Sequence, residues 1–282
     1  MLFRYLLLLF AGSVWAKPQI TWLQTDWPPH QIVSGPFQGQ GTFDLLRQQL
    51  ISAMPQFEHQ SRLVSLARLE QIFLQQEPGM CAIGTLFSAE RAQTRLFSQP
   101  VAAGPALAIG YVQQRLNQYG AVQGVAIDIN KLALDARLLG AYQPNRYYPP
   151  VVEQMLQHPT TNLSRHAFTS ELNAAALLAS GRVDYVLEYP ERMQYYNQLL
   201  KQPVMLTHKA IAGATHASVS HITCTLGSAG EIAIAAVDQA LIQLWQQPEY
   251  LLAMRRWLDE TAWQRLAPDI HQVQQMYRMA QQ

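Results

Sequence analysis

Residues 84–100, GTLFSAERAQTRLFSQP, carry the chain from one apolar run into another through a short polar turn. The run that leads into this turn, CAIGTL (81–86), is typical of a buried strand. Arg91 stands in the turn of a chain in which only 14% of the residues are charged. Such an arginine is either a surface group that pairs with Glu90 or caps the turn, or a side chain that holds an anion from outside the chain.

Strand and helix signals alternate on both sides of this stretch. We expect strands at 19–24, 62–66, 105–112, 121–127, 183–188, 203–207 and 218–225. We expect helices at 42–54, 67–76, 130–139, 151–157, 170–180 and 190–200, from 230 to 247, and again from 248. Strands that alternate with helices predict an α/β fold with parallel pairing, and the polar segment 113–120 predicts a crossing into a second lobe.

The first sixteen residues, MLFRYLLLLFAGSVWA, have the pattern of a secretory signal peptide. One arginine precedes the apolar run, and small residues end it before Lys17. The alternative, a membrane anchor, needs about 20 apolar residues, more than this run contains. We therefore expect an exported chain that begins near Lys17 and is not inserted in the membrane after cleavage.

The charge and the cysteine count narrow the class of protein further. The net charge is +1 and no basic stripe occurs, so we expect no nucleic-acid partner. The two cysteines, Cys81 and Cys224, form an even set, which in an exported protein favours a disulfide; two buried free thiols are the alternative. His216, His221 and Cys224 form a metal-like cluster, but it lacks a fourth ligand, and we predict no metal and no cofactor.

Four landmarks occur in a familiar order. They are Trp27-Pro28-Pro29 after the first strand, Gly41-Thr42-Phe43-Asp44 at a helix start, the block Thr85, Glu90, Arg91, Phe97, Ser98 and Pro100, and the step Gly181-Arg182-Val183-Asp184 into a strand. With these landmarks the chain resembles the bacterial periplasmic solute-binding proteins of the polar amino-acid type, the partners of ABC transporters. The resemblance covers essentially the whole mature chain.

The resemblance implies a two-lobed, type II periplasmic binding protein-like fold, in which each lobe is a mixed, mostly parallel sheet flanked by helices. Lobe one would comprise residues 17–108 and 218–282, and lobe two residues 109–217, with the ligand held between them as the lobes close. Both cysteines would then fall in or near lobe one, where a disulfide between them is sterically plausible.

The resemblance also assigns ligand-binding roles. Arg91 matches the arginine that binds a ligand carboxylate, and a planar guanidinium suits that group because it can bind it bidentately. Thr85, at the end of the strand, would assist with its hydroxyl and its backbone N–H. Trp27 would cover an apolar or cationic part of the ligand, although core packing explains it equally well.

Lobe two departs from the family pattern. The register from Asp184 places Tyr189 where the family has an acid for the ligand ammonium, with Glu188 one residue earlier, so either Glu188 substitutes or the ligand lacks an amino group. The hydroxyl-rich loop of the family is replaced by AIDINKLALD (126–135), in which Asp128 and Asn130 remain polar. The tyrosines of this half favour a ring-bearing or apolar ligand, or else pack in the core: Tyr147, Tyr148, Tyr185 and Tyr189.

These features predict a monomeric, non-enzymatic periplasmic protein that binds a small carboxylate-bearing solute and delivers it to an ABC permease. One alternative is a ligand-sensing partner of a membrane receptor. Another is a periplasmic dehydratase-type enzyme, in which Glu188 would be the general acid.

Overall fold

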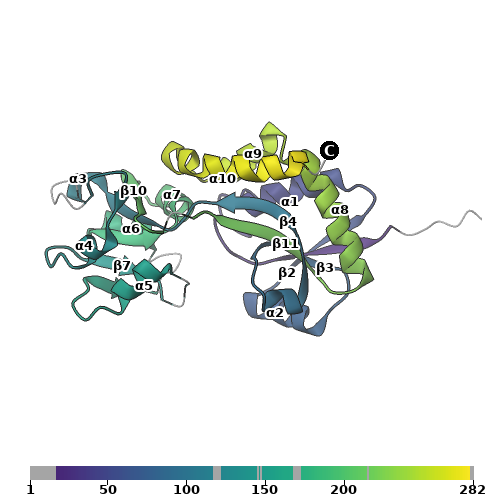
Figure 1. Ribbon diagram of the computed structural model, residues 1–282, viewed down its shortest axis with the longest axis horizontal. Helices are drawn as coiled ribbons and strands as arrows, with labels where there is room; N and C mark the ends of the chain where they lie inside the picture. The colour runs from purple at the N-terminus through teal and green to yellow at the C-terminus, as the bar shows by residue number, and fades with distance from the viewer. Residues whose placement is uncertain are drawn as a thin grey trace, which may run out of the picture.

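The computed structural model describes residues 17–116, 122–144, 146, 148–167, 173–214 and 216–279. The predicted signal peptide, Tyr147 and the predicted helix cap Ser170 lie outside these residues. The described strands form two sheets that lie side by side along the long axis of the molecule (Figure 1). The chain is therefore an α/β protein with two lobes, as the sequence predicts.

The first sheet has the strand order β2-β1-β3-β11-β4. Its strands are β1 (Gln19–Gln24), β2 (Glu58–Leu63), β3 (Met80–Leu86), β4 (Arg95–Gly104) and β11 (Ser218–Thr225). Strands β1, β2 and β3 are parallel, whereas β11 is antiparallel to both β3 and β4.

The second sheet has the order β6-β10-β5-β9-β7-β8. Its strands are β5 (Ala108–Val112), β6 (Ala126–Ile127), β7 (Gly140–Tyr142), β8 (Leu163–Arg165), β9 (Tyr185–Glu188) and β10 (Leu206–Ile211). Strand β5 is antiparallel to both of its neighbours, β10 and β9, while the other pairs are parallel.

Helices complete the two lobes, which we name by their sheets. Lobe one carries α1 (Thr42–Ala53), α2 (Leu66–Gln75), the short η1 (Arg91–Gln93), α8 (Ser228–Leu244), α9 (Pro248–Arg255) and α10 (Glu260–Met279). Lobe two carries α3 (Gln113–Leu116), α4 (Ile129–Ala133), α5 (Pro150–Leu156), α6 (Ala174–Ala179) and α7 (Pro190–Gln198). Among these described helices, none combines the length and the apolar character that a membrane crossing requires.

Two segments connect the lobes, and they correct one prediction. Residues 105–107 lead from β4 into β5, and residues 212–217 lead back from β10 into β11. The predicted crossing at 113–120 is wrong, because β5 already belongs to the second sheet and Gln113–Leu116 forms α3, which packs on β5 within lobe two. Polarity misled the prediction, since the true connections are short and partly apolar.

The connections fix which edges of the two sheets face each other. Leu86, the last residue of β3, is paired with Ser220 near the start of β11, on the side where β11 arrives from lobe two. Glu188, the last residue of β9, is paired with Ala108 at the start of β5, on the side where β5 arrives from lobe one. The carboxyl ends of the parallel strands therefore lie on the facing edges, where α/β sheets bind their ligands.

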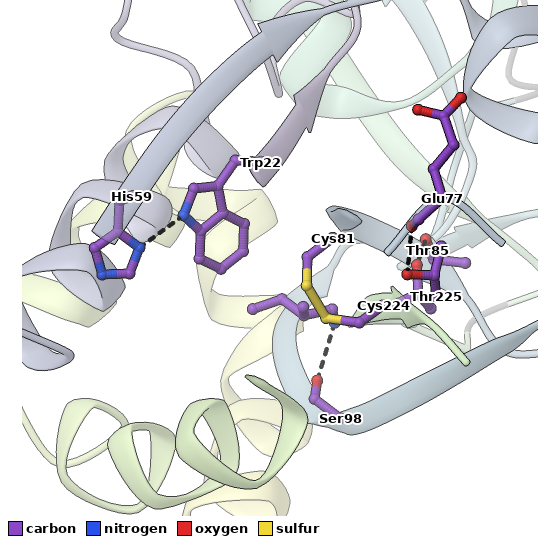
Figure 2. The surroundings of a disulfide bond; sticks show 10 residues. Trp22, His59, Glu77, Cys81, Thr85, Ser98, Cys224 and Thr225 are labelled. Atoms are coloured by element: carbon purple, nitrogen blue, oxygen red, sulfur yellow. Dashed lines mark hydrogen bonds between the residues drawn. A yellow bond between two sulfur atoms is a disulfide. The ribbon is translucent and has the colours of Figure 1, made fainter. Parts of the chain in front are cut away.

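A disulfide joins Cys81 and Cys224, as the cysteine count favours, and the Cα atoms of the pair are 4.1 Å apart. The two residues are register partners on β3 and β11, and both are fully buried. Figure 2 shows Trp22 and Ser98 near the bond; the indole N–H of Trp22 donates to His59, and the hydroxyl of Ser98 accepts the backbone N–H of Ile222. The bridge thus links the neighbouring strands β3 and β11 of the lobe-one sheet.

Candidate functional site

An aromatic group lies where β1 ends, on the edge of lobe one that faces lobe two. Trp27 is 42% exposed, and its ring centroid is 4.6 Å from that of His30 and 6.0 Å from that of Phe43. Phe43 in turn presses against Gly84 of β3, where a Cβ atom would lie only 2.2 Å from the ring. Gly84 has a φ of +97°, so glycine is required both for the backbone conformation and for the space. The exposed indole of Trp27 therefore packs on the rings of His30 and Phe43, and Phe43 is held in place by its contact with Gly84.

Thr85 and Arg91 lie on the same edge, at and beyond the end of β3. The hydroxyl oxygen of Thr85 is 3.0 Å from that of Thr223 on β11, so this side chain is anchored to its own sheet. Arg91 opens η1 and is exposed, and its Nη1 donates to the carbonyl oxygen of Leu86 at 3.0 Å. Within the described part of the chain, Arg91 forms no ion pair. The contact with Leu86 caps the turn and leaves other N–H groups of the guanidinium without a partner among the described residues.

Glu188 is the centre of a charged group on the opposite edge, in lobe two. Its carboxylate accepts from Arg146 Nη1 at 2.7 Å, from Arg192 Nε at 3.3 Å and from the backbone N–H of Tyr189 at 2.9 Å. The guanidinium of Arg146 also stands over the ring of Tyr189, 5.4 Å from its centroid. Glu188 is almost fully buried, while the two arginine side chains are 16% and 13% exposed.

Two contacts connect these edges across the lobes. Arg192 of α7 donates through Nη1 to the carbonyl oxygen of Pro28 at 2.9 Å, next to Trp27. Nearby, His30 Nε2 is 3.8 Å from Glu191 Oε1. Trp27 and Glu188, which are far apart in sequence, are thus joined through Arg192, because α7 contacts the loop after β1. Figure 1 shows α7 where lobe two meets lobe one.

Burial keeps both members of the His30–Glu191 pair uncharged at neutral pH. Desolvation, aided by the positive charge of Arg192, lowers the pKa of His30 to about 3. Desolvation raises the pKa of Glu191 to about 8, with the nearby Glu188 charge acting in the same direction. Neither His30 Nδ1 nor Glu191 Oε2 has a hydrogen-bond partner among the described residues. The arginines and Glu188 are therefore the groups that set the charge of this edge at pH 7.

Several sequence candidates have structural roles instead. Tyr185 is fully buried and donates to Asn162, and Tyr148 is buried with its hydroxyl donating to the carbonyl oxygen of Gln143 at 2.8 Å. Among the predicted tyrosines that the structure describes, Tyr189 has its ring against a charged group of this edge, the guanidinium of Arg146. Asp128 caps α4 by accepting the N–H of Asn130 at 3.0 Å.

The residues of the metal-like cluster are also used in other ways. Cys224 is bonded to Cys81, and His221 Nδ1 lies 2.8 Å from the carbonyl oxygen of Ser98. In the parts of the chain that the structure describes, no group of three His, Cys, Asp or Glu residues could hold a metal ion.

A groove of about 650 Å³ lies elsewhere on lobe one, between α1 and the α8–α9 region. Its lining includes Gln48, Gln49 and Gln247, with Glu249 and Arg256 as its charged groups. It is open to solvent and lies on helix surfaces, away from the carboxyl ends of the strands. The facing edges carry the converging charged and aromatic groups, and we take them as the candidate site.

The sequence predictions missed Arg146, Arg192, His30 and Glu191. Arg146 and Glu188 are separated by 42 residues, and nothing local connects them. Arg192 follows Glu188 by four residues, but Glu188 ends β9 and α7 begins at Pro190, so no regular helical spacing in the sequence indicates this ion pair.

No family model matches the sequence, and no curated protein matches it. Solved structures do match this chain. A protein of Bacillus subtilis described as a probable amino-acid ABC transporter extracellular-binding protein is 15% identical, with a TM-score of 0.66 over 86% of this chain and 98% of that one. An ancestral cationic amino acid solute-binding protein is 13% identical, with a TM-score of 0.63 over 86% and 96%. The periplasmic VFT2 domain of Bordetella pertussis BvgS is 17% identical, with a TM-score of 0.57 over 86% and 94%.

This chain has the type II periplasmic binding protein fold. The predicted fold class is confirmed, and the structural neighbours match the resemblance drawn from the sequence motifs. The neighbours named above are described as binding proteins and a periplasmic VFT2 domain. By the general rule for open α/β sheets, the facing edges at the carboxyl ends of the strands are the place to seek a ligand.

Proposed function

We propose that this protein binds a small, carboxylate-bearing solute between its lobes, with residues 17–108 and 218–282 as lobe one and 109–217 as lobe two. Arg91 holds the carboxylate, Thr85 assists it, and Trp27 covers the body of the solute. From lobe two, Glu188 and Tyr189 face the solute as part of the arginine-bound group. The protein has no catalytic role in this proposal.

One observation carries this proposal. The carboxyl ends of the parallel strands of both sheets lie on facing edges; the lobe-one edge carries Trp27 and Arg91, and on the lobe-two edge Arg146 stands over Tyr189. Guanidinium groups at such positions bind carboxylates through paired, charge-assisted hydrogen bonds, each worth about 1.5–3 kcal/mol. A micromolar dissociation constant, which corresponds to about −8 kcal/mol, needs little beyond this clamp and the burial of an apolar surface.

The proposed location is the periplasm, after removal of residues 1–16. The Cys81–Cys224 disulfide supports this, because such bonds persist in oxidising compartments. The proposed partner is an ABC permease, in line with the transporter-associated binding proteins among the structural neighbours. Another solved structure with a similar fold, described as a histidine kinase sensor domain with similarity to periplasmic binding proteins (15% identity, TM-score 0.56 over 86% of this chain and 96% of that one), supports a second candidate, a sensory partner of a membrane receptor. Deleting the gene distinguishes the two: uptake of the identified solute is lost in the first case, and a transcriptional or signalling response to it in the second.

A thermal-shift screen of amino acids and organic acids tests the binding proposal. A solute at 100 times its dissociation constant should stabilise the protein by about 2.7 kcal/mol. Arg91→Ala should abolish this shift and leave the melting temperature of the free protein unchanged. Arg182→Ala is the matched control, since Arg182 is exposed and precedes β9 on the opposite edge of the sheet. Retained binding of carboxylates by the Arg91 variant would refute the assigned role.

A further inference from the structure

The hydrogen-bonding capacity of Glu188 is already used within the protein. Its two oxygens accept from Arg146 at 2.7 and 3.4 Å, from Arg192 at 3.3 Å and from the Tyr189 N–H at 2.9 Å. An ionised carboxylate offers about four acceptor sites, and these contacts fill them. With 1% of its side chain exposed, Glu188 could bind a solute ammonium only by giving up an arginine.

The charge around Glu188 also opposes an ammonium group. Arg146 and Arg192 contribute two positive charges against one negative charge of Glu188. The neighbouring Glu191 is protonated at neutral pH, because burial raises its pKa to about 8. Asp26, just before Trp27, is exposed and is the one carboxylate in the loop 25–41. The lobe-two side of the site is therefore net positive.

The lobe-one side offers an apolar surface. Trp27 is 42% exposed, Leu86 45% and Phe87 62%, and all three lie at the carboxyl ends of β1 and β3. Leu63 and Leu66, at the end of β2 and the start of α2, are exposed as well. Exposed apolar groups gathered at one place mark a binding surface. Since they border the edge that faces the arginines, a solute that reaches both edges gains from an apolar body, which would bury this surface.

We infer that the solute is an organic acid with an apolar body and no ammonium group, bound between Arg91 of lobe one and the Arg146–Glu188–Arg192 group of lobe two. This inference rests on the proposed function and specifies its substrate class. In the Arg146–Glu188–Arg192 group on the lobe-two edge, the described residues offer an ammonium no ionised carboxylate that is free of arginine, and the ammonium would lie beside an excess of guanidinium charge.

Matched pairs of acids test this inference by isothermal titration calorimetry at pH 7. Each pair contains an amino acid and the same acid without its amino group: phenylalanine and hydrocinnamate, leucine and isocaproate, glutamate and glutarate. We expect the acid without the amino group to bind about tenfold more tightly or better, and the apolar pairs to bind more tightly than the glutamate pair.

Variants of Arg146 give a second readout. Arg146→Met should free part of the Glu188 carboxylate and should reduce or invert the preference for acids without an amino group. Arg146→Lys should retain this preference, because the positive charge remains. Arg182→Met serves as the control for loss of an arginine at a distance. If the amino acids bind the wild-type protein, through Glu188 or Asp26, as tightly as the matched acids without an amino group, the inference is overturned and the proposed function stands. Binding of no acid from either series would overturn both.

Discussion

The buried pair His30–Glu191 makes the stability of the protein depend on pH in a direction that can be worked out. Glu191 keeps its proton up to a pKa of about 8 in the folded state, but ionises near 4.5 when the chain unfolds. Its contribution to stability is complete below about pH 4.5 and is lost progressively as the pH rises to about 8. His30, with a folded pKa of about 3 against an ordinary 6.5, contributes fully above pH 6.5 and loses its contribution as the pH falls.

Between pH 6.5 and pH 8, Glu191 is therefore the member of the pair that changes stability. Each pH unit over which one state holds an extra proton is worth about 1.4 kcal/mol, so the free energy of unfolding should fall by about 2 kcal/mol over this interval. Glu191→Gln keeps the shape of the side chain but cannot ionise, and should remove this part of the pH dependence.

Urea denaturation of the wild type and the Glu191→Gln variant at about pH 6.5, 7.3 and 8 measures how the free energy of unfolding of each depends on pH. Glu153→Gln is the matched control, because Glu153 also lies in the first turn of a lobe-two helix but is exposed. We expect the control to follow the wild type. Parallel pH profiles for wild type and Glu191→Gln would show that this carboxyl is ionised in the folded protein, and would refute the reasoning.

Three further predictions concern the framework of lobe one. Replacing both Cys81 and Cys224 with alanine should lower the free energy of unfolding by about 5 kcal/mol, because the bridge spans 143 residues, and reductant should shift the urea midpoint of the wild type but not of the variant. Gly84→Ala should cost about 2 kcal/mol or more in thermal melting, since its Cβ would lie 2.2 Å from an aromatic ring, whereas Gly35→Ala, with open space around it, should cost about 1 kcal/mol from backbone strain alone. Asp44→Ala should cost about 3 kcal/mol in thermal melting, because this buried carboxylate accepts two backbone N–H groups of the loop before α1. An unchanged urea midpoint for the cysteine variant, or an unchanged melting temperature for Gly84→Ala or Asp44→Ala, would contradict the corresponding premise.

The elements predicted best from sequence are those with a strong local pattern and clear ends. Strands β1 and β11 match the predicted limits 19–24 and 218–225, since both are runs of apolar and β-branched residues that pack in the lobe-one core. Helices α2, α7 and α9 begin within a residue of their predicted starts, because a serine cap or a proline in the first turn marks each of them.

Other elements have no local signal of this kind. Strand β2 forms at Glu58–Leu63 instead of the predicted 62–66, because this edge strand is polar and is defined by its pairing with β1. The predicted helix at 130–139 is limited to Ile129–Ala133, residues 134–139 form turns and loop, and β7 begins at Gly140–Tyr142, a strand of three residues that pairing with β9 defines. Long-range partners decide such elements, so a window of sequence does not reveal them.

Part of the candidate site could be predicted from the sequence, and part depends on long-range contacts. The strand ends that carry Trp27, Thr85 and Glu188 follow from the α/β pattern, because ligand-facing groups gather at the carboxyl ends of parallel strands. The state of Glu188 does not follow from it. Whether that carboxylate is free or neutralised depends on Arg146, which a different segment supplies, and this difference separates a site for amino acids from one for other organic acids.

In the proposed function, a partner protein would distinguish the bound from the free form by the relative orientation of the two lobes. The contacts between the lobes bear on this orientation. Phe37 and Trp257 of lobe one pack on Tyr195 of lobe two, with ring centroids 5.1–6.1 Å apart, and His208 of β10 lies 2.6 Å from Asp259, at the start of the C-terminal helices. Aromatic packing and a side-chain contact therefore join the two lobes in this structure. A solute shifts the lobe orientation only as far as its affinities for the two orientations differ. Since the cationic groups stand on opposite lobes, an anion that touches one lobe alone gains nothing from rotation, whereas one that reaches both binds more tightly in the orientation that brings them together. In the proposed function, the same pair of charges would link selection of the solute to a change in lobe orientation that a permease or a receptor would detect.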